Sequence, residues 1–538
     1  MINYGYTSGL VFAVGASIVS VVLIVLFDDG VLGNDFAQMV SVARNLIGGS
    51  GLQTDLIYYD VHYAMEAPRV PQTVFPPGQS ILVAPLMVAG ASSYAAALTW
   101  SLIAFHVSGL LLTLTVRQLG AQDATAIFVL VTWLILGINW TNVLACRSES
   151  LFIATTIVGL HSFVRWMHGG CESRTHLIVL GTAAASALLF RYQGLLFIAA
   201  VGLYFFARAL GARERGALLD LVTVSALPAI LVVVTSAYNA SVTGGIGGGP
   251  IDHAQQSAGI FPVALGYYYE TSKILGVSRE YFVRGGASEL FGIALFAYVV
   301  YLAIRVARRQ GFWESIAQSR TFFFCATYIG ISIAALVYLS LTKSVGYTQA
   351  RYLSTLLPFV LVILALLGHH LRRLSHLRPW QGAVGLALVI GFIGFGQGRA
   401  ISEQLDQLAA DSRLSEIRAA LEASYGDGQS IKDFLRSEID VGKNLLANQS
   451  QLVGHVLERG TFGLTPALFT ARDFDRDEVK RMAGRHQIRY VMLFPTLYDP
   501  AAVQNQNRII LTELANRNIP DWITPVFEGP DVRLYKIE

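Results

Sequence analysis

Long runs of apolar residues separated by short polar turns fill the chain as far as residue 398. A helix that crosses a bilayer needs roughly 17–25 predominantly apolar residues. By that rule the pattern predicts about eleven membrane spans. They fall near residues 9–27, 94–116, 124–141, 150–166, 176–190, 194–209, 218–237, 287–305, 321–341, 352–369 and 380–398. The apolar stretch 81–90 is too short to span, and we expect an interfacial or re-entrant helix there.

The positions of the basic residues orient this polytopic α-helical membrane protein. With a cytoplasmic N-terminus, the short cytoplasmic turns carry most of the arginines of the apolar part. The short loops on the opposite side carry only Arg147, Arg191, Lys343 and Arg351. This bias satisfies the positive-inside rule. It places two long loops, residues 28–93 and 238–289, on the extracytoplasmic face. The N-terminus lacks a basic region and a small-residue cleavage site, so we interpret the first apolar run as a retained span.

After residue 398 the pattern changes to a mixture of charged and apolar residues. Helical periodicity is found near residues 401–423 and 475–485, and short strands are expected at 444–447, 490–494, 526–528 and 533–537. This mixture predicts a small α/β domain over residues 399–538, following a transmembrane domain over residues 1–398. An odd number of spans places that second domain outside, on the same face as the first loop.

Composition supports the membrane assignment and excludes other classes. Hydrophobic residues make up 54% of the 538 residues and charged residues only 14%, against about 25% charged in soluble domains. The net charge of +3 comes without a basic stripe, which argues against a nucleic-acid partner. The 3 cysteines are far apart, so neither a disulfide framework nor a zinc site is indicated.

Polar residues gather at the outward ends of the predicted spans. Carboxylates at the edge of a bilayer usually have a functional or an interfacial reason for lying there. Asp28 and Asp29 follow the first span directly and could simply end that helix at the lipid headgroups, whereas Asp35 lies further on. The other outward polar features are Pro76-Pro77-Gly78 and His62 in the first loop, Arg147-Ser148-Glu149, Arg191, and Arg351-Tyr352.

The order and spacing of these features resemble the GT-C class of membrane glycosyltransferases that use polyprenyl-phosphate sugars. The likeness is greatest to the branch of protein O-mannosyltransferases and lipid A aminoarabinose transferases. In that branch an acidic residue soon after the first span precedes an A-x-x-L-x-x-G-x-G pattern and then a PPG or PPL motif. Here Asp35, the stretch from Ala43 to Leu52, and Pro76-Pro77-Gly78 match. The resemblance covers most of the membrane part and implies a GT-C fold for it.

Three positions depart from the pattern of that branch. The usual Asp-Glu pair is Asp35-Phe36, and the usual tyrosine four residues on is Met39. The lysine that precedes the two prolines in the aminoarabinose enzymes is Phe75. Because that lysine helps to hold the lipid phosphate in the family, another cation must serve here, and aminoarabinose is disfavoured as the donor sugar.

The resemblance implies transfer of a sugar from a polyprenyl-phosphate donor to a hydroxyl of a glycan, lipid or protein on the outer face of a membrane, which we take to be the bacterial inner membrane. Asp35 is the expected general base, with Asp29 and Asp28 as the next candidates. Arg351 and Arg191, with Tyr352, are expected to bind the lipid phosphate, unless the arginines only anchor the chain at the headgroups.

Glu149 and His62 can each be interpreted as a functional or as a structural residue. Glu149 is a second acid that orients the acceptor or holds a metal, or it forms a salt bridge with Arg147. His62 belongs to the substrate loop, although such a histidine is more often a satisfied surface or core residue. No carboxylate set demands a metal and no cofactor is expected, although the acids could recruit a divalent ion.

Two other classes of function compete with an enzyme. A lipid or sugar transporter or flippase usually has internal repeats and helices broken at mid-membrane. Here the polar residues gather at one face, which disfavours transport. A non-catalytic assembly scaffold would not need a carboxylate and arginines under a long loop. We therefore expect membrane lipids, a lipid-linked donor and an acceptor as partners.

Overall fold

The computed structural model describes Gly15 and residues 34–538, except for 66, 68, 172, 213–214, 246–259, 275–318, 343–348, 375–412, 426–427, 440–444, 467–469, 471 and 503–504. The predicted spans 287–305 and 380–398, the span 9–27 apart from Gly15, and the carboxylates Asp28 and Asp29 lie outside the described residues.

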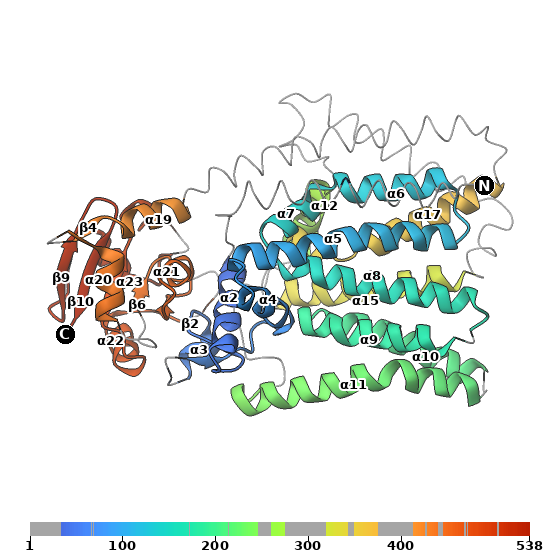
Figure 1. The fold of residues 1–538 in the computed structure, drawn as a ribbon, viewed down its shortest axis with the longest axis horizontal. Coiled ribbons are helices and arrows are strands. Elements are labelled where there is room, and N and C mark those ends of the chain that lie inside the picture. Colours follow the sequence, from blue (N-terminus) through green and yellow to red (C-terminus); the bar gives the residue numbers. More distant parts are fainter. Residues whose placement is uncertain are drawn as a thin grey trace, which may run out of the picture.

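Long apolar helices form a bundle at one end of the molecule (Figure 1). They are α5 (Ser93–Gln118), α6 (Asp123–Ile135), α7 (Gly137–Leu144), α8 (Ser148–His168), α9 (Arg174–Phe190), α10 (Gly194–Ala212), α11 (Arg215–Thr243), α15 (Arg320–Thr342) and α17 (Leu357–Leu374). Within the described ranges, 5 helices are long and apolar enough to cross a membrane, or 6 if α6 and α7 count as one bent span. Stacked aromatic rings join them, such as Phe163 of α8 and Phe324 of α15, whose centroids are 4.3 Å apart.

Two predicted spans are broken. The predicted span 124–141 bends by 51° between α6 and α7, because side chains take over the carbonyl groups that the break leaves without helical partners. Asn139 Nδ2 donates to the carbonyl of Trp133 at 2.9 Å, and Trp140 Nε1 donates to that of Leu134 at 2.7 Å. The predicted span 352–369 is divided into α16 (Ala350–Ser354) and α17, where Pro358 lacks the N–H that would continue the first helix.

The first loop folds into α2 (Asn34–Ile47), β1 (Gln53–Thr54), β2 (Leu56–Ile57), α3 (Asp60–Tyr63), β3 (Val70–Pro71) and α4 (Gly78–Val88). At 11 residues α4 is shorter than a span, as predicted. Apolar residues of α2 such as Phe36 and Val40 are buried. Polar residues of the same helix are buried as well, and one of them, Gln38, donates to the Thr54 hydroxyl at 2.9 Å. The helix is therefore enclosed by protein on both sides.

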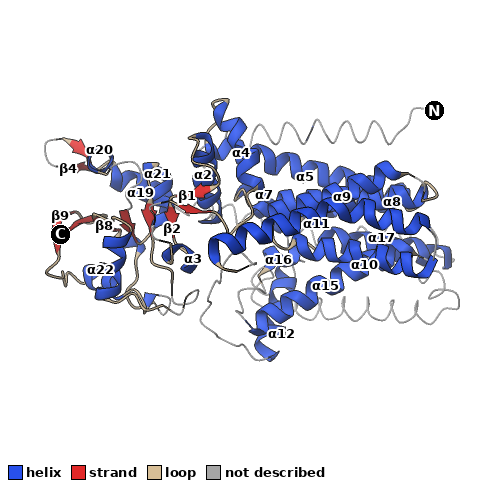
Figure 2. Ribbon diagram, turned by 90° about the horizontal axis from the view of Figure 1, so that it is seen from below, coloured by secondary structure: helices blue, strands red, loops and turns tan. Residues whose placement is uncertain are grey.

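A six-stranded sheet lies at the other end of the molecule (Figures 1 and 2). Its order is β2-β7-β6-β8-β10-β9, with β6 (Leu445–Ala447), β7 (Thr461–Phe462), β8 (Tyr490–Leu493), β9 (Ile523–Glu528) and β10 (Arg533–Ile537). The first four strands are parallel, and β10 is antiparallel to both of its neighbours. The helices of this part are α19 (Arg413–Leu421), α20 (Ile431–Glu438), α21 (Ser450–Leu457), α22 (Arg476–Arg485) and α23 (Ile509–Ala515). A short hairpin, β4 (Ser424–Tyr425) and β5 (Gln429–Ser430), precedes α20.

The secondary structure predicted for this part is largely confirmed. The strands expected at 490–494 and 533–537 are β8 and β10, and α22 starts at Asp475, whose carboxylate accepts the N–H of Glu478 at 2.8 Å. Sequence reasoning missed β7, α20, α21 and α23. It also missed that β2 of the first loop joins this sheet, where Leu56 pairs with Thr461 and Ile57 with Phe462. The first loop and the C-terminal strands therefore share one sheet.

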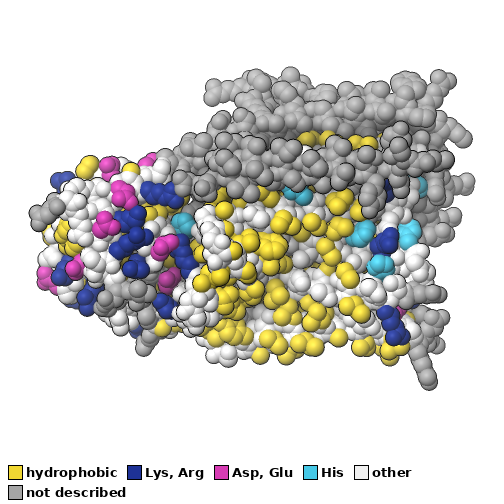
Figure 3. Space-filling view, in the orientation of Figure 1, with side chains coloured by type: hydrophobic (Ala, Val, Ile, Leu, Met, Phe, Trp, Pro, Cys, Tyr) yellow, Lys and Arg dark blue, Asp and Glu magenta, His cyan; other side chains and the backbone are white. Residues whose placement is uncertain are grey.

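The surface reflects the two parts. Hydrophobic side chains are spread over the described part of the bundle, and charged side chains gather over the C-terminal strands and helices (Figure 3). On α11, Leu218, Val222, Ile230 and Val233 are all exposed. A continuous apolar surface of this kind needs lipid to cover it. The chain is an integral membrane protein.

Candidate functional site

The short helix α16 carries two of the predicted site residues, and neighbouring elements hold it at both ends. The carboxylate of Glu270, on α12 (Ile260–Ile274), accepts the N–H of Ala350 at 3.0 Å. At the other end, Asn142 of α7 donates to the Ser354 hydroxyl at 3.2 Å. The break between α6 and α7 thus places α7 where it can support α16.

Asp35 and Arg351, which are 316 positions apart, form an ion pair. Arg351 Nη1 donates to Asp35 Oδ2 at 2.7 Å. The exposed fractions of the two side chains are 29% for Asp35 and 24% for Arg351. Asp35 lies in the first turn of α2, where the helix dipole favours a negative charge. The structure thus places the predicted base against a predicted phosphate ligand.

Glu149 and Arg191 form a second ion pair, which is more deeply buried. Their side chains are 1% and 11% exposed, and Arg191 Nη1 lies 2.8 Å from Glu149 Oε2. The same nitrogen donates to the Ser148 hydroxyl at 3.1 Å. Glu149 opens α8, and Arg191 ends α9. The alternative salt bridge of Glu149 with Arg147 is therefore wrong.

Tyr352 connects the two ion pairs. The guanidinium carbons of Arg191 and Arg351 lie 5.5 and 5.0 Å from the centroid of its ring, within cation–π distance. Arg351 Nη2 also donates to the Tyr352 hydroxyl at 3.2 Å. The arginines of both ion pairs thus contact one tyrosine. The formal charges of the two arginines and the two carboxylates cancel. We call Asp35, Glu149, Arg191, Arg351 and Tyr352 the charged cluster.

Tyr59 is a neighbour of the charged cluster that sequence reasoning missed, because no motif or charge marks it. Burial, followed by the charge of Asp35, raises the pKa of its hydroxyl well above the usual value, so the hydroxyl stays protonated. Its ring lies edge-on to Phe75, with centroids 5.8 Å apart. Phe75, which stands where the resembled family has a lysine, therefore contributes packing and no charge.

The Pro76-Pro77-Gly78 motif forms a junction between elements. A Cβ atom at Gly78 would lie 2.5 Å from the carbonyl oxygen of Leu189, near the end of α9. Gln79 donates to the carbonyl of Cys146 at 2.6 Å, just before α8, and Ser80 donates to that of Met39 in α2 at 2.8 Å. The start of α4 therefore touches α2, which carries Asp35, the turn just before α8, which carries Glu149, and the end of α9 beside Arg191.

His62 lies in the interior of the first loop. Its side chain is fully buried in α3, and Nδ1 accepts the N–H of Tyr58 at 3.4 Å. Burial lowers its pKa from 6.5 to about 3, so the ring is neutral at physiological pH. This environment is that of a core histidine.

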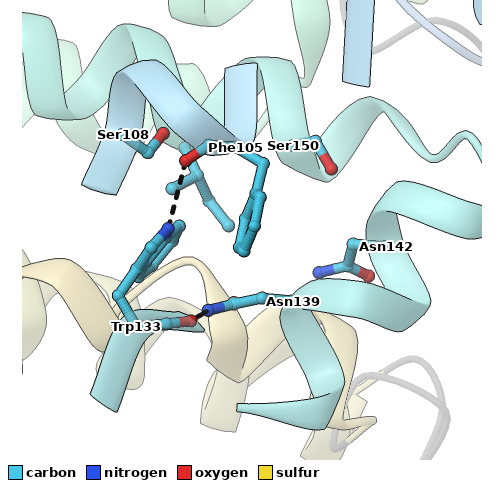
Figure 4. Close-up of a pocket in the computed structure, with 7 residues that line it drawn as sticks. Phe105, Ser108, Trp133, Asn139, Asn142 and Ser150 are labelled. Atoms are coloured by element: carbon cyan, nitrogen blue, oxygen red, sulfur yellow. Dashed lines mark hydrogen bonds between the residues drawn. The ribbon is translucent and has the colours of Figure 1, made fainter. Parts of the chain in front are cut away.

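Metal clusters and cavities were sought around the charged cluster within the part of the chain that the structure describes. Among the described residues, no three His, Cys, Asp or Glu side chains gather closely enough to hold a metal ion. A cavity of about 10 Å³ lies beside the break at α7, among Phe105, Trp133, Asn139 and Asn142 (Figure 4). That volume is close to the space one water needs. A larger cavity of about 540 Å³ lies in the C-terminal part between α19 and the β9–β10 turn, lined by Glu416, Phe494, Phe527 and Asp531 among others.

Comparison with solved structures defines the class of fold. No protein-family model and no curated protein matches the sequence. The chain nevertheless has the fold of the GT-C membrane glycosyltransferases, as the sequence pattern predicted.

The similarity to individual GT-C structures extends over nearly the whole chain. ArnT from Cupriavidus metallidurans, bound to undecaprenyl phosphate, superposes with a TM-score of 0.58 over 98% of this chain and 97% of that one, at 12% identity. The apo oligosaccharyltransferase of Archaeoglobus fulgidus gives 0.52 over 91% of this chain and 70% of that one, at 13% identity. The same enzyme tethered to an acceptor peptide gives 0.51 over 94% and 72%, at 14% identity.

Proposed function

We propose that the protein is an integral membrane glycosyltransferase, which moves a sugar from a polyprenyl-phosphate donor to an acceptor hydroxyl on the extracytoplasmic face. The observation that carries this proposal is the charged cluster, which brings a carboxylate and an arginine together at the loop end of a GT-C bundle. The ArnT structure of the same fold holds undecaprenyl phosphate. A guanidinium suits such a ligand, because it offers several N–H donors to phosphate oxygens.

The proposed reaction needs a base and a cation at one place. The acceptor oxygen attacks the anomeric carbon, the bond between that carbon and the phosphate oxygen breaks, and the hydroxyl proton passes to the carboxylate of Asp35. A positioned base contributes about 10²–10⁴-fold to such a step. Arg351 stabilises the negative charge that develops on the departing lipid phosphate. Glu149 and Arg191 hold Tyr352, and with it Arg351, in place.

A transporter or flippase remains the alternative function, and the broken span α6–α7 is the feature that would fit it. That break has another use here, since Asn142 of α7 bonds to Ser354 of α16 and so supports the helix that carries Arg351. Enzyme and transporter differ in whether the bond between sugar and phosphate is broken.

The direct test is an assay of that bond. The purified full-length protein in lipid nanodiscs is incubated with a panel of polyprenyl-phosphate hexoses and pentoses, and free polyprenyl phosphate is measured. We expect the protein to release polyprenyl phosphate from one donor, and an extract of envelope glycans, lipids or proteins should stimulate this release. The Asp35→Asn variant should not release it. A folded protein that moves labelled donor between leaflets and never releases lipid phosphate would contradict the proposal.

The same proposal assigns the protein to a bacterial inner membrane, with the C-terminus and the first loop on the extracytoplasmic side. The pairing of β2 with β7 supports a common side for both. A reporter enzyme that is active only outside the cytoplasm, fused after Glu538, should be active, and a reporter that matures only in the cytoplasm should not. The opposite pattern would reverse the orientation.

A further inference from the structure

Arg351 keeps part of its hydrogen-bonding capacity unused. One terminal nitrogen binds Asp35 and the other binds the Tyr352 hydroxyl. Its Nε is buried and has no hydrogen-bond partner among the residues that the structure describes. A guanidinium binds phosphate best through two neighbouring nitrogens. The side chain therefore has one donor that its present partners leave unused.

The two ion pairs of the charged cluster differ in how easily they can open. Separating Glu149 from Arg191 would leave a charge buried without a partner, which is strongly destabilising. Separating Asp35 from Arg351 exposes two side chains that water already reaches, and ion pairs of that kind contribute little net stability. A ligand that disturbs the cluster will therefore open the Asp35–Arg351 pair.

The donor brings a third anion to two cations, so one anion must be left without a counter-ion, and water already reaches Asp35. The two arginines and two carboxylates sum to zero, and a sugar phosphodiester brings one negative charge. If Arg351 kept its bond to Asp35, the phosphate would share one cation with a carboxylate. If Arg351 turns to the phosphate, the phosphate is paired with Arg351 and Glu149 stays paired with Arg191. Asp35 is then left without a counter-ion beside the sugar.

We propose, on the basis of the proposed function, that Asp35 and the donor phosphate compete for Arg351, so that donor binding releases the carboxylate that accepts the acceptor's proton. Without donor, Asp35 is a counter-ion of Arg351 and holds α2 against α16. With donor, it is a free base. The enzyme therefore binds its donor before its acceptor is activated.

The test measures binding of polyprenyl monophosphate, without sugar or acceptor, to the full-length protein in nanodiscs. Asp35→Asn removes the competing charge, so the affinity should rise by about tenfold while turnover is lost. Asp35→Ser, which keeps a polar side chain at the start of α2, should show the same gain. Asp55→Asn is the matched control, because it removes a carboxylate of the same loop that bonds to Ser41 and not to Arg351. Its affinity should change by less than about twofold.

A double-mutant cycle separates competition from simple repulsion. In the Arg351→Gln background, Asp35→Asn should give no gain, because there is no guanidinium left to release. The competition would be overturned if the two Asp35 variants bound polyprenyl monophosphate no more tightly than the unaltered protein does. It would also be overturned if Asp35→Asn raised the affinity in the Arg351→Gln background. A wild-type protein that transfers sugar but lacks this affinity pattern would keep the proposed function and lose this inference. If the affinity pattern is found but no sugar is transferred, the competition for Arg351 is kept and the proposed function is lost.

Discussion

At the scale of single residues, the two arginines of the charged cluster differ in their surroundings. Arg191 is enclosed together with Glu149, so this pair is a fixed support, whereas Arg351 and Asp35 remain partly open to water. The same pair of residue types thus serves two purposes. The sequence indicated all four side chains and their common face, but it contained no sign of which acid meets which arginine.

Asp35 is expected to be the least replaceable side chain. Asp35→Asn keeps the shape and hydrogen bonding of the side chain but cannot take up a proton. Turnover should therefore fall by about 10²–10⁴-fold, and the folded yield should stay normal because the side chain is partly exposed. Release of lipid phosphate under saturating donor checks this. Near-normal turnover would transfer the role of base to Asp29 or Asp28.

Arg351 is expected to act through its fork of donors. Arg351→Ala should weaken donor binding and slow turnover, and Arg351→Lys should restore only part of either, because an ammonium group cannot bind two phosphate oxygens in a planar fork. Measured kcat and KM for the donor distinguish the two variants. Full activity of the alanine variant would reduce Arg351 to an anchor at the headgroups.

At the scale of elements, the apolar pattern predicted where the helices of the described part of the bundle lie, because burial in lipid depends mainly on length and composition. The break at α7 could not be predicted, since the groups that make it possible, Asn139 and Trp140, satisfy carbonyls through their side chains. The break before α17 did carry a signal, Pro358, which a hydropathy count ignores. The strand β2 could not be predicted, because two residues are too few to show a pattern. Its partner, β7, also lies far along the chain, where Leu56 pairs with Thr461.

Gly78 tests whether the α4 junction positions the charged cluster. Gly78→Ala would press a Cβ against the carbonyl of Leu189, two residues before Arg191. We expect a loss of about 1–3 kcal/mol of stability together with reduced turnover. Gly202→Ala in α10 is the control, since nothing lies within 4 Å of the added atom. Thermal unfolding and turnover of both variants are compared, and equal behaviour would show that the junction tolerates the methyl group.

At the scale of the whole molecule, the first loop lies between the helical bundle and the C-terminal part and is bound to both (Figure 1). Its joint with the C-terminal part includes an ion pair between Arg44 and Glu458 at 3.4 Å and the half-buried ring of His455 near Phe36, with centroids 6.4 Å apart. A deletion of residues 399–538 would therefore remove the partner of β2 as well as the C-terminal helices. Loss of activity in such a deletion would therefore not assign a separate function to the C-terminal part.

The joint should weaken in mild acid. Burial lowers the pKa of His62 and of His455 to about 3 each, from an ordinary 6.5. Because the unfolded chain binds these protons more readily, their contribution to stability is complete above pH ~6.5 and is lost progressively as the pH falls toward 3. The unfolding temperature should therefore fall between about pH 6.5 and pH 5, before most carboxylates titrate.

The matched variants for this prediction are His62→Gln and His455→Gln, which cannot take up the proton. Each should show a smaller fall of the unfolding temperature over that interval than the unaltered protein. An unchanged slope in both would show that the two histidines do not control the joint.

The pairing of β2 with β7 has a consequence for how the protein is made. The loop that holds Asp35 is synthesised early, whereas the partner of its strand, Thr461–Phe462, follows much later in the chain. Until that late segment has been made, β2 lacks its neighbour, and Asp35 likewise has to wait for Arg351. The sheet and the charged cluster are therefore complete only in the finished polypeptide.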